Sequence, residues 1–192
     1  MRTGASGSPG VSVAATVDGV PVSVEEVDAR EQRLRGSRLA SSLPRPGTSE
    51  GRQLRRWLTQ LLVTERVVDA EARALGLTAD GAPTEDALLP DTTARLEIGS
   101  VAASVLSDPR GRAVFERVTG RVEVTDADVA SYHERNPSRF TTTTEVAEHL
   151  LGAARRREFR RWLDASCAAL VELAPGYEHP GDPRQPDNTH RH

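Results

Sequence analysis

The sequence contains no lysine, since all 25 of its basic residues are arginine. A nucleotide-binding P-loop and a Schiff-base enzyme both require a lysine amine, so these two classes are excluded. The chain also has no G-x-S-x-G segment, which excludes the serine nucleophile elbow of α/β-hydrolase-type enzymes. These absences leave the question of catalysis open but favour a protein that is not an enzyme.

Cysteine and long apolar runs are also scarce. Cys167 is the single cysteine, so no disulfide can form within the chain, and we expect a buried, inert thiol. The first residues lack the apolar stretch of a secretion signal, and no run approaches the length of a membrane span. We therefore expect a cytoplasmic protein without a membrane segment, in which residues 1–10 form a flexible lead.

Aromatic residues are few and the charge is nearly balanced. Aromatic residues make up 4% and hydrophobic residues 37% of the chain, which predicts a modest core built mainly from aliphatic side chains. The net charge of −3 provides no bulk attraction for a polyanion, so we expect no nucleic-acid partner.

The clearest local pattern is a hairpin signal near the N-terminus. Asp18-Gly19 lies between β-branched residues, which predicts two short strands over residues 13–17 and 20–22. Ser23 followed three residues later by Glu26 is a capping box, which predicts a helix that begins there and continues to about Arg35.

The rest of the chain has mostly helical periodicity. We expect a helix over about residues 52–75. A second helix should begin at Asp91 or Thr92 and bury four apolar side chains, Leu96, Ile98, Val101 and Val105. A short helix around Val114 and Phe115 and another after the capping box of Thr125 and Asp128 should follow. The threonines at 141–144 are interpreted as a linker before a long helix over about residues 145–170, and residues 171–173 as a strand. The predicted fold is mostly α, a compact helical module with a small β-sheet that joins the termini. Residues 11–174 would form one domain, and residues 175–192 a Pro/His-rich tail.

Three segments, taken in order, suggest a relationship. "VDGVPVSVEEVDARE", a helix ending "EARALGL", and "VEVTDADVASYHERNPSRF" together resemble the N-terminal region of SurA-like parvulin foldases of the PpiC and PrsA types. The positions that match the last segment of that family are Val124, Thr125, Asp126, Val129, Tyr132, Asn136, Pro137 and Phe140. After Phe140, where the family continues into its isomerase domain, the chain continues with a segment that resembles the terminal helix of the chaperone module. The chain as a whole is also similar to small uncharacterised actinobacterial proteins found near polyketide genes.

This resemblance implies a chaperone-like or scaffold protein without prolyl-isomerase activity. Such a module would bind apolar peptide segments of a partner in a groove between its helices. The residues we expect in that groove or in the adjacent core are Trp57, Leu61, Phe115, Tyr132 and Phe140. No cofactor is expected on this hypothesis.

The C-terminal tail supports an alternative hypothesis. His179, Asp182, His190 and His192 are groups that can act as acids and bases, and the three histidines can also bind a divalent metal such as zinc. On this view the protein is a small-molecule enzyme or an auxiliary factor of secondary metabolism that encloses an apolar substrate. A solvated tail without chemistry, anchored through Tyr177, remains the simpler interpretation.

An arginine-rich stretch suggests a further partner. Residues 155–161 contain Arg155, Arg156, Arg157, Arg160 and Arg161. These guanidinium groups could contact a carrier protein, through its phosphate-bearing arm or an acidic helix, although a solvated helix face is the simpler reading. A homodimer that exchanges its terminal helix is a third hypothesis.

Overall fold

A computed structural model of the chain describes residues 12–184. The described residues form helices with one small antiparallel sheet, as the sequence predicts. The elements are β1 (Val13–Val17), β2 (Val20–Ser23), α1 (Val24–Arg35), η1 (Ala40–Ser42), α2 (Ser49–Ala74), α3 (Glu85–Leu88), α4 (Thr92–Ile98), α5 (Ser100–Val105), α6 (Pro109–Thr119), α7 (Asp126–Arg135), α8 (Thr143–Leu170) and β3 (Val171–Leu173).

These elements divide into two compact units. Among the described residues, unit 1 comprises residues 12–63 and 170–184, and unit 2 comprises residues 64–169. In sequence, unit 2 is therefore inserted between the two parts of unit 1. The expectation of one domain over residues 11–174 stays a prediction.

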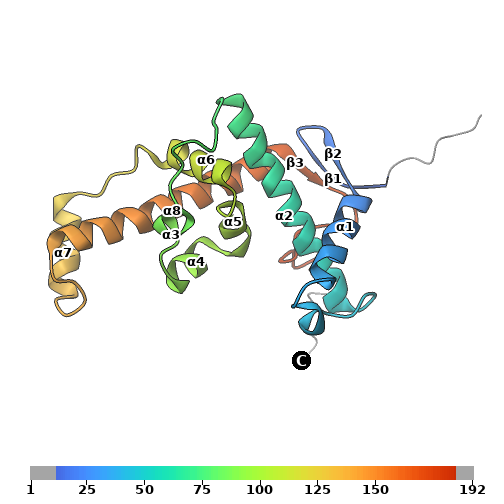
Figure 1. The fold of residues 1–192 in the computed structure, drawn as a ribbon, viewed down its shortest axis with the longest axis horizontal. Helices are drawn as coiled ribbons and strands as arrows, with labels where there is room; N and C mark the ends of the chain where they lie inside the picture. The colour runs from blue at the N-terminus through green and yellow to red at the C-terminus, as the bar shows by residue number, and fades with distance from the viewer. Residues whose placement is uncertain (1–11, 185–192) are drawn as a thin grey trace, which may run out of the picture. The chain divides into compact units, whose positions relative to one another are not determined.

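The sheet of unit 1 joins the two ends of the chain, which confirms the prediction. Its strand order is β2-β1-β3, and both pairings are antiparallel; Figure 1 shows β1 between the other two strands. Asp18 and Gly19 form the turn with φ angles of 49° and 73°, the left-handed conformation that a tight hairpin requires. Across the sheet, Val17 pairs with Val20 on one side and with Val171 on the other.

The predicted capping box at the start of α1 is present. The Ser23 hydroxyl accepts a hydrogen bond from the Glu26 amide at 3.2 Å, and Glu26 accepts one from the Ser23 amide at 2.8 Å. Two amide groups that the first turn leaves without helical partners are thereby satisfied. The buried apolar side chains of this unit include Ala14, Ala15, Val17, Val22, Val27, Leu58 and Leu61.

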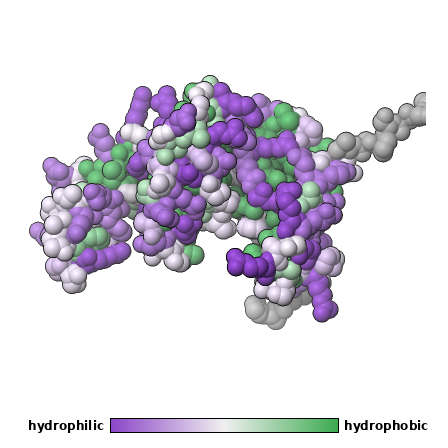
Figure 2. Space-filling model, viewed as in Figure 1, coloured by the Kyte–Doolittle hydropathy of each residue, from purple (hydrophilic) through white to green (hydrophobic). Residues whose placement is uncertain are grey.

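Unit 2 packs helices around a core that contains two aromatic rings. The rings of Phe115 on α6 and Phe159 on α8 lie 5.1 Å apart and are both almost fully buried. Other buried side chains of this unit are Leu89, Ile98, Leu106, Val114 and Leu163. Figure 2 shows that hydrophilic residues cover most of the visible surface and that apolar residues form small separate patches.

Two sequence predictions in this unit are wrong. The expected single helix after Asp91 is interrupted at Gly99, whose φ of 86° ends α4 and begins α5, and Leu96 is 76% exposed rather than buried. The threonines at 141–144 are not all linker, because α8 already begins at Thr143. Here the Thr142 hydroxyl accepts a hydrogen bond from the Glu145 amide at 3.2 Å, so a polar stretch that looks like a linker provides the helix cap.

Candidate functional site

The site we consider lies on the hairpin formed by α7 and α8, both within unit 2. At the start of α7, Thr125 and Asp128 form the predicted capping box. Asn136 ends α7 just before Pro137, which cannot continue the hydrogen bonding of a helix. The chain then reverses, and α7 lies beside the N-terminal half of α8 (Figure 1).

A ring cluster holds this hairpin together. Tyr132 from α7, Phe140 from the connecting loop and His149 from α8 have ring centroids 5.1 to 5.8 Å apart. The Tyr132 hydroxyl lies 3.4 Å from Nε2 of His149 and accepts a hydrogen bond of the same length from Arg139. The Tyr132–Phe140 pair contributes about 0.5–1.5 kcal/mol beyond its burial, and the contacts of both rings with His149 attach α7 and the loop to α8.

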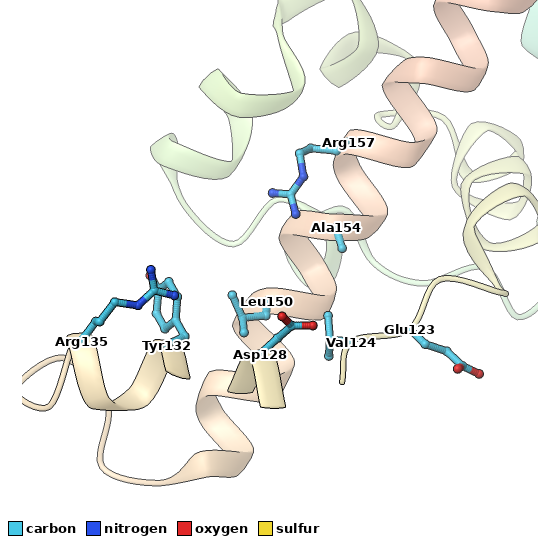
Figure 3. Close-up of a pocket in the computed structure, with 8 residues that line it drawn as sticks. All are labelled: Glu123, Val124, Asp128, Tyr132, Arg135, Leu150, Ala154 and Arg157. Carbon is cyan, nitrogen blue, oxygen red and sulfur yellow. The ribbon is translucent and has the colours of Figure 1, made fainter. Parts of the chain in front are cut away.

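A groove lies beside this cluster, between α7, α8 and the segment that leads into α7. It encloses a cavity of about 370 Å³ and is open to solvent. The residues that line it are Glu123, Val124, Asp128, Tyr132, Arg135, Leu150, Ala154 and Arg157, and they are labelled in Figure 3. We call this cavity the α7–α8 groove.

Two helical stripes form the walls of the α7–α8 groove. On α7, Asp128, Tyr132 and Arg135 are spaced at i, i+4 and i+7, and on α8 the residues at 150, 154 and 157 have the same spacing. Residues at this spacing share one face of a helix. Each helix therefore presents a single face to the groove.

The groove combines an aliphatic floor with charged residues around it. Val124, Leu150 and Ala154 are partly buried and supply the apolar surface, while Arg135 and Arg157 are exposed. In Figure 3, Arg157 extends from α8 toward the side on which Arg135 and Tyr132 lie, whereas Glu123 points away from α8. A volume of this size and this mixture of surfaces suit one or two side chains of a bound segment.

A second cavity of about 320 Å³ lies between α8 and the α3–α4 region. Its wall contains Arg156, a largely buried residue that donates hydrogen bonds to Glu97 at 3.0 and 3.3 Å and to the Leu88 carbonyl at 3.3 Å. His149 also lines this cavity, and its partial burial together with the positive charge of Arg139 lowers its pKa below the ordinary value of 6.5. His149 is therefore uncharged at neutral pH, where it packs with Tyr132 and Phe140.

The arginines of the 155–161 stretch have different environments. Arg155 bonds the Thr119 hydroxyl, pairs with Glu116 and lies over the Phe115 ring, and Arg156 pairs with Glu97. Both are engaged inside unit 2. Arg157 is exposed in the groove, while Arg160 and Arg161 are exposed and face carboxylates on their own helix. A carrier-protein contact stays a prediction, and the exposed arginines are the ones able to make it.

The five residues expected in the binding groove fall into different places. Trp57 and Leu61 lie on α2 in unit 1, where Trp57 is partly buried and Leu61 is 4% exposed. Phe115 belongs to the core of unit 2. Tyr132 lines the α7–α8 groove, and Phe140 supports it from the connecting loop. Binding-groove roles stay a prediction for all five, and the geometry favours Tyr132.

The described part of the tail is held by unit 1. Nη2 of Arg55 donates to the Tyr177 hydroxyl at 3.3 Å, and Nε of Arg56 donates to the Gly176 carbonyl at 3.3 Å. Arg55 is itself fixed by Asp28 and Glu31 on α1, at 2.7 and 2.8 Å. Tyr177 thus attaches the tail through its hydroxyl.

The structure describes two of the four residues that were expected to form a site in the tail, His179 and Asp182. The exposed His179 accepts a hydrogen bond at Nδ1 from the Gly181 amide at 3.0 Å. Hydrogen bonds from Arg184 lower the pKa of Asp182 to about 2, so this carboxylate is ionised at neutral pH. His190 and His192 lie outside the described residues.

The arrangement of the possible metal ligands bears on the zinc hypothesis. Within residues 12–184, no group of three or more histidine, cysteine, aspartate or glutamate side chains is arranged to hold a metal ion. Zinc binding by His179, His190 and His192 stays a prediction. Cys167 is partly buried, and burial raises the pKa of its thiol.

The sequence interpretation missed most of the residues that line the groove. The sequence alone gives no reason to name Leu150, Arg135 or Ala154 as site residues, and Val124 is expected only as a position of the family-like segment. The i, i+4, i+7 stripes on both helices were the available signal. A stripe on one helix does not identify its neighbour, however, so the pairing of α7 with α8 was needed to find the groove.

Comparisons with known proteins give one match. A family model described as a family of unknown function (DUF7158) matches residues 13–50. This segment comprises β1, β2, α1, η1 and the first residues of α2, all in unit 1. No curated protein and no solved structure matches the chain. The resemblance to SurA-like foldases stays a prediction. Among the described residues, no helix has the length and apolar character needed to cross a membrane.

Proposed function

We propose that the protein is a chaperone-like or scaffold protein that binds an apolar segment of a partner protein in the α7–α8 groove. The observation that carries this proposal is the open cavity of about 370 Å³ with an aliphatic floor and charged residues around it. An apolar floor contributes binding free energy when a side chain covers it, and the charged residues keep the empty groove hydrated.

The rigidity of the hairpin also supports this function. The capping box of α7, the cap of α8 and the ring cluster position both stripes before any ligand arrives. A groove that is formed in advance binds with a smaller loss of conformational entropy than one that must be ordered by its ligand. Short apolar segments, which bury little surface, benefit most from this.

The direct test is suppression of aggregation. The full chain is mixed with a thermally unfolding test client, and light scattering is followed with and without the protein. We expect the wild-type protein to delay aggregation, and Leu150→Asp, which places a charge on the groove floor, to lose this effect. Leu96→Asp is the matched control, because Leu96 is an exposed leucine of the same unit that does not line the groove.

Circular dichroism must first show that both variants are folded. If folded wild-type and Leu150→Asp protein delay client aggregation equally, the groove is not the binding site. Absence of protection by the wild-type protein at any ratio would refute the proposed function. A prolyl-peptide isomerisation assay should accompany the aggregation assay. Isomerase turnover well above background would contradict a role without isomerase activity.

A further inference from the structure

We propose that the segment bound by the α7–α8 groove is acidic as well as apolar, and that Arg135 and Arg157 bind one of its carboxylates. This inference rests on the proposed function of the groove and specifies its partner.

The groove is lined by two carboxylates and two arginines, so its formal charges balance. The two carboxylates differ from the arginines in what holds them and in where they point. Asp128 lies in the first turn of α7, where the helix dipole stabilises its negative charge, and its Oδ2 accepts hydrogen bonds from the Thr125 hydroxyl at 2.6 Å and the Thr125 amide at 3.4 Å. Part of its capacity is therefore used within the capping box. Glu123 points away from α8 (Figure 3).

The two arginines are available to a ligand. Arg135 uses Nε to bond the Ser131 carbonyl at 3.0 Å, which leaves its terminal Nη groups for another acceptor. Within residues 12–184, no hydrogen bond, ion pair or ring contact engages Arg157. Its neighbour on the same helix, Arg156, is by contrast fully committed to Glu97 and the Leu88 carbonyl.

The position of these two guanidinium groups beside the aliphatic floor determines the chemistry of the ligand. Guanidinium groups bind carboxylates through paired hydrogen bonds, and Leu150 and Ala154 lie on the same stripe as Arg157. A partner segment with an aliphatic side chain next to a glutamate or aspartate satisfies both features together. A basic segment would instead place like charges beside Arg157.

The test uses three fluorescein-labelled peptides with identical leucine and alanine positions. The remaining positions carry glutamate in the first peptide, glutamine in the second and lysine in the third. Binding to the full chain is measured by fluorescence anisotropy. We expect the glutamate peptide to bind at least about tenfold more tightly than the lysine peptide at low ionic strength, and sodium chloride to reduce the difference by screening the charges.

Two variants on α8 test the role of Arg157. Arg157→Gln should remove most of the preference for glutamate, and Arg157→Glu should make the lysine peptide the tighter ligand. Arg161→Gln is the matched control, because Arg161 is also an exposed arginine of α8 but does not line the groove. Unchanged preference in Arg157→Gln would overturn the assignment.

The outcomes separate this inference from the proposed function. If the glutamate and glutamine peptides bind the wild-type protein equally, the acidic preference is wrong while peptide binding stands. If the lysine peptide binds most tightly, the inference is also overturned. If no peptide binds and the protein fails to delay client aggregation, both proposals fall.

Discussion

The ion pair between Arg156 and Glu97 predicts an unequal response to mutation. The Arg156 side chain is 8% exposed, whereas the Glu97 side chain is 40% exposed. Glu97→Ala leaves a guanidinium group buried, with the Leu88 carbonyl as its remaining acceptor among residues 12–184. Arg156→Met removes the buried charge and leaves Glu97 in contact with water. The loss of the exposed partner should therefore be the more damaging change.

The magnitudes follow from this difference in burial. Breaking a fully buried pair by removing one partner costs about 3–5 kcal/mol. Because Glu97 is partly hydrated and Arg156 keeps one acceptor, we expect Glu97→Ala to lower the free energy of unfolding by about 2 kcal/mol. Arg156→Met should change it by less than about 1 kcal/mol, since a well-packed apolar side chain can replace a buried charge at little cost. The double variant should match Arg156→Met, which gives a coupling of about 2 kcal/mol.

Urea unfolding followed by tryptophan fluorescence measures these values. Trp162 stacks on Phe159 with ring centroids 5.5 Å apart, so its emission reports on unit 2. A Trp57→Phe background removes the signal of the other tryptophan, which lies in unit 1. A larger loss of stability in Arg156→Met than in Glu97→Ala, with unchanged slopes in urea, would refute the reasoning.

Three further predictions concern local features. Ser23→Ala removes the hydroxyl of the first capping box and should lower the unfolding free energy by about 1 kcal/mol, measured by thermal unfolding; a change near zero would contradict the role of the cap. Gly111→Ala should destabilise by about 1–3 kcal/mol, because a Cβ there would collide with the Val105 carbonyl oxygen, whereas Gly36→Ala, with its nearest contact at 3.5 Å, is the control that should change little. The native pKa of His149 should lie below 6.5 by NMR titration, so its contribution to stability is complete above pH 6.5 and is lost as the pH falls from there through the lowered native value. His149→Gln should remove this pH dependence, and a native midpoint at or above 6.5 would contradict it.

Features set by a few neighbouring residues could be predicted from the sequence. The turn at Asp18-Gly19 and the capping boxes at Ser23 and Thr125 each depend on residues within about one helical turn. The joining of residues 171–173 to the N-terminal hairpin was also predicted. An isolated two-stranded hairpin is only marginally stable, so the short N-terminal hairpin needs a third strand beside it.

Features that depend on packing between helices could not be predicted. Which face of α4 is buried depends on its neighbours: Ala94 and Ile98 face the core, and Leu96, two residues before Ile98, lies on the opposite side of the helix. The sequence also does not distinguish the role of Arg156 from that of Arg157. Their different roles depend on what lies opposite each of them, Glu97 in one case and the open groove in the other.

The strand order of the sheet has a consequence for how the protein is made. β1 is translated before every helix of the described chain, yet one of its two partners, β3, is translated only after α8. Until then β1 has an unpaired edge, of the kind that recruits other chains. The hydrogen bond from the Asp18 amide to the Leu170 carbonyl, at 2.8 Å, is among the contacts that must wait. Unit 1 therefore completes its fold only after β3 has been translated, whereas every residue of unit 2 has been synthesised before β3.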